Sequence, residues 1–171
     1  AGYDDALAYL RPGLTLCNAR GVHDASTAEL AVGLAISSRR GFPEFMREQI
    51  AGNWSHHRTA SLSDSKIGIV GFGSIGKKIA QNLSGFEVSI TAFTQSGRDG
   101  SLTIDQLDSH LPQLDIVILI LPLSDSSRHL FNAERLSKMK DGALLVNVAR
   151  GPVVDTDALL NELNSRRIFA A

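Results

Sequence analysis

Three glycines, at positions 71, 73 and 76, form the segment of this sequence with the clearest chemistry. They lie in the run GFGSIG, directly after the apolar segment 66–70 and at the start of an amphipathic helical pattern. Gly71 would allow a tight turn, Gly73 would let the backbone approach a pyrophosphate, and Gly76 would let helix and strand pack closely. The phosphates would lie on free N–H groups at the helix start near Ser74. The pattern therefore predicts a dinucleotide site, and a purely structural glycine turn is the alternative.

The elements around this turn alternate between strand and helix. We predict strands at 66–70, 88–93, 101–103, 115–120 and 143–147, a sixth strand beginning at Ile168, and helices near 74–84, 104–111, 133–138 and 156–164. The run 116–120 is continuously apolar, which is typical of a central parallel strand covered on both faces. Right-handed crossovers then favour a Rossmann-type α/β fold, a doubly wound parallel sheet of order 3-2-1-4-5-6 with helices on both faces.

The residues before position 66 predict a short strand, two helices and an irregular crossing segment. The strand would cover Leu14–Asn18, and Ser26–Glu29 has the pattern of a capping box that opens a helix to about residue 40. That helix is apolar on most sides, so we expect it to be buried, with another subunit as one candidate cover. Pro43 would start a second helix through about Ile50, and 54–65 would be irregular.

Composition excludes several classes of function. The chain has 171 residues, enough for one domain with its own core, and its 17 Lys and Arg nearly balance its 18 Asp and Glu. No basic field therefore indicates nucleic acid or a membrane surface as a partner. The single Cys17 suits a reducing compartment, and we expect a cytoplasmic protein without a metal site.

Two further loops would lie past the carboxyl ends of strands, where ligands bind in such sheets. They are LPLS at 121–124 and NVARG at 147–151. With GFGSIG at 71–76, the segments LPLSDSSRHL at 121–130, VNVARGPVVD at 146–155 and NARGVHDASTAEL at 18–30 make the chain resemble the D-isomer-specific 2-hydroxyacid dehydrogenases. This resemblance spans nearly the whole sequence.

The resemblance implies roles for particular residues. Arg150 would bind the substrate carboxylate while hydride passes to the carbonyl carbon, and its planar, permanently charged guanidinium suits that role. The alternative is a surface arginine in a salt bridge. The resemblance also implies cofactor contacts from Ser74, Ile75, Thr27, Leu121, Pro122, Ser127 and Val148, although Thr27 could instead belong to the helix cap and Pro122 could merely end a strand.

The identity of the cofactor depends on the end of the second strand. An NAD site usually has an acidic residue there for the ribose hydroxyls, and Thr94 occupies that position in this sequence. Thr94 would not repel a 2′-phosphate, and Arg98 is available to pair with one. We therefore favour NADP(H). The alternative is NAD, with Thr94 bound to the ribose hydroxyl, Arg98 solvated, or Asp99 folded back.

The resemblance also implies residues that this sequence does not contain. The family's acid–base His and its partner Glu would follow the VNVARG loop, and none of the five histidines matches their positions. We expect residues 1–24 to be a remnant of a substrate domain and its connection, and residues 25–171 to be the dinucleotide-binding domain. We expect this fragment to bind dinucleotide without turning over a 2-keto or 2-hydroxy acid.

Two other readings remain open from the sequence. A dinucleotide-sensing regulatory protein, such as a corepressor-like module, would share the fold and most of these motifs; a different nucleotide-binding protein such as a methyltransferase fits them less well. We also expect a homodimer, because the apolar helix at 27–40 and the arm through Trp54 resemble the family's dimerisation region. Burial of that face against a substrate domain is the alternative.

Overall fold

A six-stranded parallel sheet forms the centre of the molecule, with the order β3-β2-β1-β4-β5-β6. The computed structural model describes residues 8–17, 19 and 21–171. The strands are β1 (Lys66–Val70), β2 (Ser89–Thr94), β3 (Leu102–Thr103), β4 (Ile116–Leu119), β5 (Leu144–Asn147) and β6 (Phe169–Ala170). The predicted fold class and strand order are confirmed, and each observed strand lies within two residues of its predicted range.

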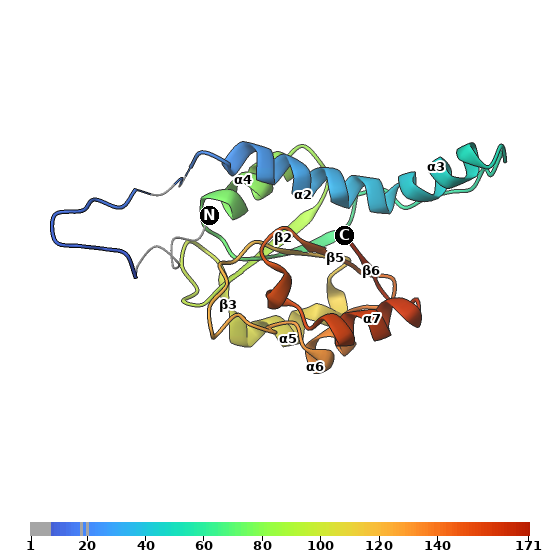
Figure 1. Cartoon of the computed structure of the whole chain (residues 1–171). Helices are drawn as coiled ribbons and strands as arrows, with labels where there is room; N and C mark the ends of the chain where they lie inside the picture. The colour runs from blue at the N-terminus through green and yellow to red at the C-terminus, as the bar shows by residue number, and fades with distance from the viewer. Residues whose placement is uncertain (1–7, 18, 20) are drawn as a thin grey trace.

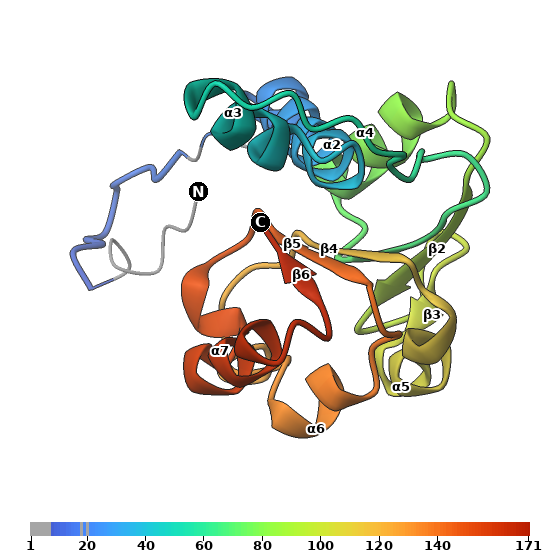
Figure 2. The same ribbon diagram turned by 90° about the vertical axis from the view of Figure 1, so that its right-hand side faces the viewer.

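Helices cover both faces of this sheet (Figures 1 and 2). One face carries α2 (Asp24–Arg39) and α4 (Ser74–Leu83), and α3 (Phe42–Ile50) continues outward from the end of α2 (Figure 1). The other face carries α5 (Leu107–His110), α6 (Ala133–Ser137) and α7 (Thr156–Asn164). Short 3-10 turns lie at Ile104–Gln106, Leu111–Gln113 and Gly151–Val153.

The apolar run 116–120 is explained by the position of β4 between β1 and β5. All four residues of β4 are buried, and their side chains alternate between two apolar layers. Val117 and Leu119 join the layer under α5, α6 and α7, whereas Ile116 and Ile118 join the layer under α2 and α4. Covering both faces of a parallel strand in this way requires apolar residues at successive positions rather than at alternate ones.

Three local predictions are wrong. Leu14–Cys17 form no strand: these residues are exposed, and they pair with no strand among the described residues. Asn18, the last residue of the predicted strand, lies outside the described residues. The capping box at 26–29 is absent: α2 begins at Asp24, two residues earlier, and the Ser26 hydroxyl donates to the His23 carbonyl instead of accepting from an N–H group.

The third correction concerns the helix expected at 104–111. It is broken into a 3-10 turn, the short helix α5 and a second 3-10 turn. A capping box between Thr103 and Gln106 starts the first turn, and Pro112 lies in the second, where it cannot donate to a continuing helix. The proposed boundary at residue 24 stays a prediction, because residues 1–7, 18 and 20 lie outside the described residues.

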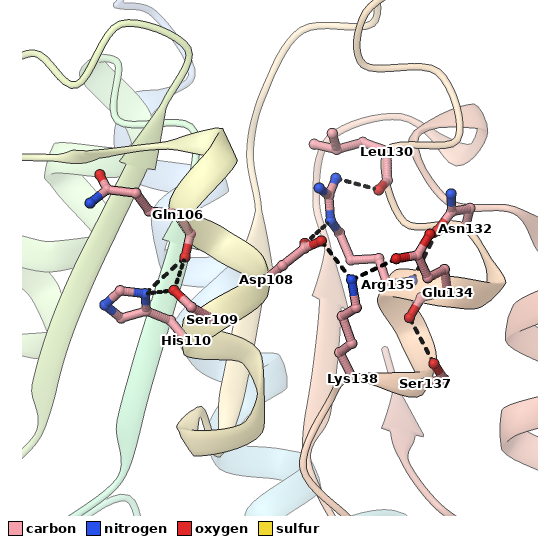
Figure 3. A network of polar contacts seen from close by, with 10 residues as sticks. All are labelled: Gln106, Asp108, Ser109, His110, Leu130, Asn132, Glu134, Arg135, Ser137 and Lys138. Carbon is pink, nitrogen blue, oxygen red and sulfur yellow. Dashed lines mark hydrogen bonds and ion pairs between the residues drawn. The ribbon is translucent and has the colours of Figure 1, made fainter.

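An ion-pair network ties α5 to α6 on the second face (Figure 3). Asp108 accepts from Arg135 Nε at 2.5 Å and from Lys138 Nζ at 2.9 Å. Arg135 also donates to the carbonyl of Leu130, and Lys138 also pairs with Glu134. Burial by itself raises the pKa of Asp108, but the two cationic donors outweigh that effect and hold the pKa below its ordinary value.

Removing this carboxylate should destabilise the fold in a pH-dependent way. We expect Asp108→Ala to cost about 1–2 kcal/mol at neutral pH, because two partly buried cations lose their acceptor. A lowered folded-state pKa means that the contribution is fully present above the unfolded-state pKa of about 3.9 and is lost as pH falls through the folded value. Thermal unfolding at pH 7 and below pH 3 would check this: the two proteins should differ at pH 7 and converge in acid. Glu134→Gln, at an exposed partner of Lys138, should change stability by less than about 0.5 kcal/mol.

Candidate functional site

Three loops meet at the carboxyl edge of the sheet because their strands are neighbours. The N–H of Ile120 donates to the carbonyl of Val70 at 2.9 Å, and the N–H of Val148 donates to the carbonyl of Leu119 at 3.1 Å. These ladder bonds set the glycine turn after β1 beside the loop after β4, and that loop beside the one after β5. The segments 71–76, 121–124 and 147–151 therefore form one edge, as the parallel topology predicts.

The three glycines have different surroundings. Gly71 has φ +104°, and a Cβ there would lie 2.5 Å from the carbonyl oxygen of Ile120. A Cβ on Gly76 would collide with the carbonyl oxygen of Gly71. Gly71 is therefore required by its backbone conformation and by the close backbone at Ile120, and Gly76 by the packing of the turn itself. Gly73 has no atom within 4 Å of an added Cβ and an extended backbone that any residue adopts. Among the described residues, no packing contact therefore requires glycine at position 73. The absence of a side chain there leaves room for a ligand to contact the backbone.

The start of α4 is suited to an anion. Gly73 is the N-cap residue, no side chain caps the helix, and its first turn carries no acidic residue. The ten-residue helix presents N–H groups and the positive end of its dipole at this point. These features fit the diphosphate of a dinucleotide, which would lie against the open backbone at Gly73.

A hollow of about 400 Å³ extends from the glycine turn toward the end of β2. Four predicted residues, Gly73, Ser74, Thr94 and Arg98, lie along its wall together with Phe72, Lys77 and Asp99. Sequence reasoning missed Phe72 and Lys77, although Lys77 stands one helical turn after Gly73, a spacing that places both on one face of α4. The glycine turn and the two residues predicted to determine the preference between NAD and NADP, Thr94 and Arg98, therefore line the same hollow.

The residues at the far end of this hollow are held by hydrogen bonds. Thr94 Oγ1 lies 2.7 Å from Ser101 Oγ, which donates to the carbonyl of Arg98 at 2.6 Å. Lys77 Nζ pairs with Asp99 Oδ2 at 2.8 Å. The hydrogen bond and charge from Lys77 hold the pKa of Asp99 below its ordinary value, so this carboxylate is charged at neutral pH.

Other predicted contacts lie outside this hollow. Ile75 is half-buried and packs against the apolar layer under α2 and α4, as does Val148, while Leu121 packs against the other layer. The buried Ser127 accepts from the N–H of Ser124 and donates to the carbonyl of Pro122, so it holds the loop after β4 in shape. Thr27 is half-buried in the first turn of α2. Cofactor contacts by these residues stay predictions.

Arg150 is exposed at the end of the loop after β5. Asn147 shapes that loop: its side chain accepts from the N–H of Ala149 at 3.0 Å and donates to the carbonyl of Arg150 at 3.1 Å. The guanidinium donates to the carbonyl of Ala149 at 2.8 Å. Arg150 forms no salt bridge with the described residues, so its exposed charge is accessible to an anion.

Among the residues that the structure describes, no group of three or more His, Cys, Asp or Glu side chains could hold a metal ion. None of the helices described is both long and apolar enough to cross a membrane.

The same three loops lie within a match to a known family. The family model of the D-isomer specific 2-hydroxyacid dehydrogenase NAD binding domain matches residues 32–171. The chain belongs to this family. Its glycine turn, the loop after β4 and the loop after β5 all fall within the matched region, so the resemblance suggested by the motifs is confirmed.

Individual relatives agree with this assignment. The chain is 32% identical over 163 residues to a hydroxypyruvate reductase of Thermotoga maritima, covering 93% of this chain and 53% of that protein. It superposes on a D-isomer specific 2-hydroxyacid dehydrogenase of Xanthobacter autotrophicus Py2, solved with NADPH and MES, with a TM-score of 0.84 and 29% identity. That match covers 98% of this chain and 72% of the dehydrogenase chain. It also superposes on an NAD-dependent formate dehydrogenase of Staphylococcus aureus, solved with NAD, with a TM-score of 0.78 and 31% identity. That match covers 85% of this chain and 46% of the formate dehydrogenase chain.

These comparisons identify the NAD binding domain of the family and bear on the alternatives. The family model describes dehydrogenases, and the three proteins are dehydrogenases or reductases. They therefore give no support to the alternative that the chain is a dinucleotide-sensing regulatory protein. One solved relative holds NAD and another holds NADPH, so the family as such does not choose between the two cofactors. The chain spans about half the length of the curated relatives that it matches.

Proposed function

We propose that this domain binds NADP(H) in preference to NAD(H) and serves the interconversion of a 2-keto acid and a D-2-hydroxy acid. The observation that carries the cofactor preference is the hollow that joins the glycine turn to Thr94 and Arg98. Thr94 is neutral and hydrogen-bonded to Ser101, so the residue at the end of β2 does not repel a 2′-phosphate. Arg98 supplies a permanent positive charge at the same wall.

The preference is tested by fluorescence titration of the chain with NADPH and with NADH. We expect NADPH to bind about tenfold more tightly, the effect of one charge-assisted contact to the 2′-phosphate. Arg98→Gln should remove most of that difference while leaving NADH binding nearly unchanged. Tighter binding of NADH by the unaltered chain would contradict the preference, and no binding of either nucleotide would contradict the site itself.

Within this proposal, the residues of the chain bind and orient, and a bound nicotinamide ring supplies or accepts the hydride. The N–H groups at the start of α4 hold the diphosphate, and Arg150 holds the substrate carboxylate through its planar fork. Glyoxylate and hydroxypyruvate, the substrates named for relatives, are the 2-keto acids to try first.

We assign no proton donor among the histidines of this sequence. His110 contacts the Phe93 ring edge-on and bonds to the Gln106 carbonyl, and His57 stacks on Phe45 at α3. Because carbonyl reduction needs an acid beside the reacting oxygen, we expect these 171 residues to bind dinucleotide without measurable reduction of a keto acid. Turnover of either keto acid by this chain would refute that expectation.

We also propose a homodimer formed through α2 and α3 in a cytoplasmic protein. None of the nine residues of α3 is buried, and Met46, Ile50 and Trp54 are 61%, 85% and 94% exposed along this arm. Such an apolar surface is typical of an interface. The exposed free Cys17 supports a reducing compartment. Light scattering should give a dimer at tens of micromolar that Ile50→Lys weakens, whereas a monomer of the unaltered chain would contradict this proposal.

A further inference from the structure

The ion pair between Lys77 and Asp99 lies on the wall of the hollow and joins two separate elements. Lys77 belongs to the first turns of α4, and Asp99 belongs to the loop between β2 and β3. Their side chains are about half exposed, so the pair contributes little to the stability of the fold. Both residues nevertheless line the same hollow as Thr94 and Arg98, which gives the pair a position where a ligand would meet it.

The loop that carries Asp99 is held in one shape. Gly97, Asp99 and Gly100 all have left-handed backbones, with φ of 65°, 57° and 77°. Glycine adopts this conformation freely and Asp tolerates it better than most residues. Ser101 fixes the loop to the end of β2 through its bonds to Thr94 and to the Arg98 carbonyl. Arg98 and Asp99 are therefore presented together, with opposite charges, at one end of the hollow.

The charges around the hollow do not balance. Lys77 and Arg98 are positive and Asp99 is the single negative side chain of the wall, so one positive charge is left over in the absence of a ligand. A 2′-phosphate carries close to two negative charges and can accept hydrogen bonds from both cations. The ribose 2′-hydroxyl of NAD(H) is neutral and cannot replace the carboxylate in the same way.

We infer that Lys77 is a second cation for the ribose 2′-phosphate and that Asp99 is a carboxylate that competes with the phosphate for it. This inference rests on the proposed dinucleotide site at the glycine turn. When NADP(H) binds, Lys77 would pair with the 2′-phosphate and its ion pair with Asp99 would break. When NAD(H) binds, the ion pair between Lys77 and Asp99 would stay intact. Asp99 thus limits the selectivity that Lys77 and Arg98 create, and the two members of one ion pair have opposite effects on the choice of cofactor.

The test is a titration of four proteins with NADPH and NADH: the unaltered chain, Lys77→Met, Asp99→Asn and Lys78→Met. We expect Lys77→Met to weaken NADPH binding about threefold and to leave NADH binding nearly unchanged. Asp99→Asn should tighten NADPH binding about threefold or more, with little effect on NADH. Lys78 is the matched control, because it is the next residue of α4, bonds to Gln81 at 2.9 Å and is absent from the wall of the hollow. Its substitution should change neither affinity.

The outcomes separate this inference from the proposed function. If the unaltered chain binds neither nucleotide, the site at the glycine turn fails and this inference fails with it. If both nucleotides bind but Lys77→Met weakens them equally, or Asp99→Asn weakens NADPH, the inference alone is overturned. The selectivity for NADPH should also decrease between 0.05 M and 0.5 M salt, because the contacts are partly exposed. Thermal unfolding of all four proteins should show that each variant is folded.

Discussion

Gly73→Ala should leave the fold intact and reduce dinucleotide affinity by about a hundredfold. The added methyl group meets no atom within 4 Å and the backbone at Gly73 is extended, so the folded protein has room for it. That room is where the diphosphate would touch the backbone at the start of α4. A methyl group there would hold the phosphates away from the N–H groups and weaken charge-assisted hydrogen bonds worth about 1.5–3 kcal/mol each.

Gly71→Ala and Gly76→Ala provide the contrast. An alanine at Gly71 would combine a left-handed backbone, costing about 1–2 kcal/mol, with a backbone collision at Ile120. An alanine at Gly76 would collide with the carbonyl of Gly71. We expect both variants to lose several kcal/mol of stability or to fail to fold. Thermal unfolding and NADPH titration of the three variants would check the contrast, and an unstable Gly73→Ala or one with full affinity would contradict it.

Arg150→Ala should reduce kcat/KM for a 2-keto acid by about a thousandfold in an active enzyme that contains this domain, and Arg150→Lys should recover little of it. A bidentate guanidinium–carboxylate pair both binds the substrate and orients its carbonyl, and a thousandfold corresponds to about 4 kcal/mol. Lysine keeps the charge but lacks the planar fork, so it would restore attraction without alignment. Steady-state reduction of glyoxylate and hydroxypyruvate gives the measurement.

Dinucleotide affinity is the internal control for Arg150. Because Arg150 is not among the residues predicted to contact the cofactor, NADPH should bind the Arg150 variants within about threefold of normal. Arg166→Lys, at an exposed arginine in the turn after α7, should behave like the unaltered protein. An Arg150→Ala enzyme with unchanged kcat/KM would show that this side chain is a surface residue only.

The sheet was predictable from sequence because its strands carry a strong local signal. The run 116–120 is apolar at every position, which is typical of a strand buried on both faces, and it is flanked by loops with turn residues. The glycine spacing likewise identified the turn after β1, because the left-handed backbone at Gly71 and the close contact of Gly76 with Gly71 both act within a few residues. The strand predicted at Leu14–Cys17 failed because no neighbouring strand is present among the described residues. The capping box failed for a local reason, because Ser26 bonds backward to His23.

The candidate site was predictable only in part for a related reason. Gly73, Ser74, Thr94 and Arg98 were found because they follow strands in known positions, and the structure places them on one hollow. The pairing of Lys77 with Asp99 spans 22 residues and depends on the left-handed backbone at Asp99, which the sequence does not specify. Similarly, no local pattern reveals that Asn147 shapes the loop that carries Arg150.

The complete burial of β4 has a consequence for the timescale on which the site keeps its shape. Amide protons of a strand enclosed on both faces exchange with water mainly when the whole domain opens, whereas those of exposed loops exchange through local fluctuations. Ladder bonds attach β4 directly to the start of the glycine turn and to the loop that precedes Arg150. The spacing between the two places where cofactor and substrate would be held is thus set by a strand whose amide protons we expect to exchange slowly. The loop that carries Arg98 and Asp99 is exposed, so we expect its amide protons to exchange sooner.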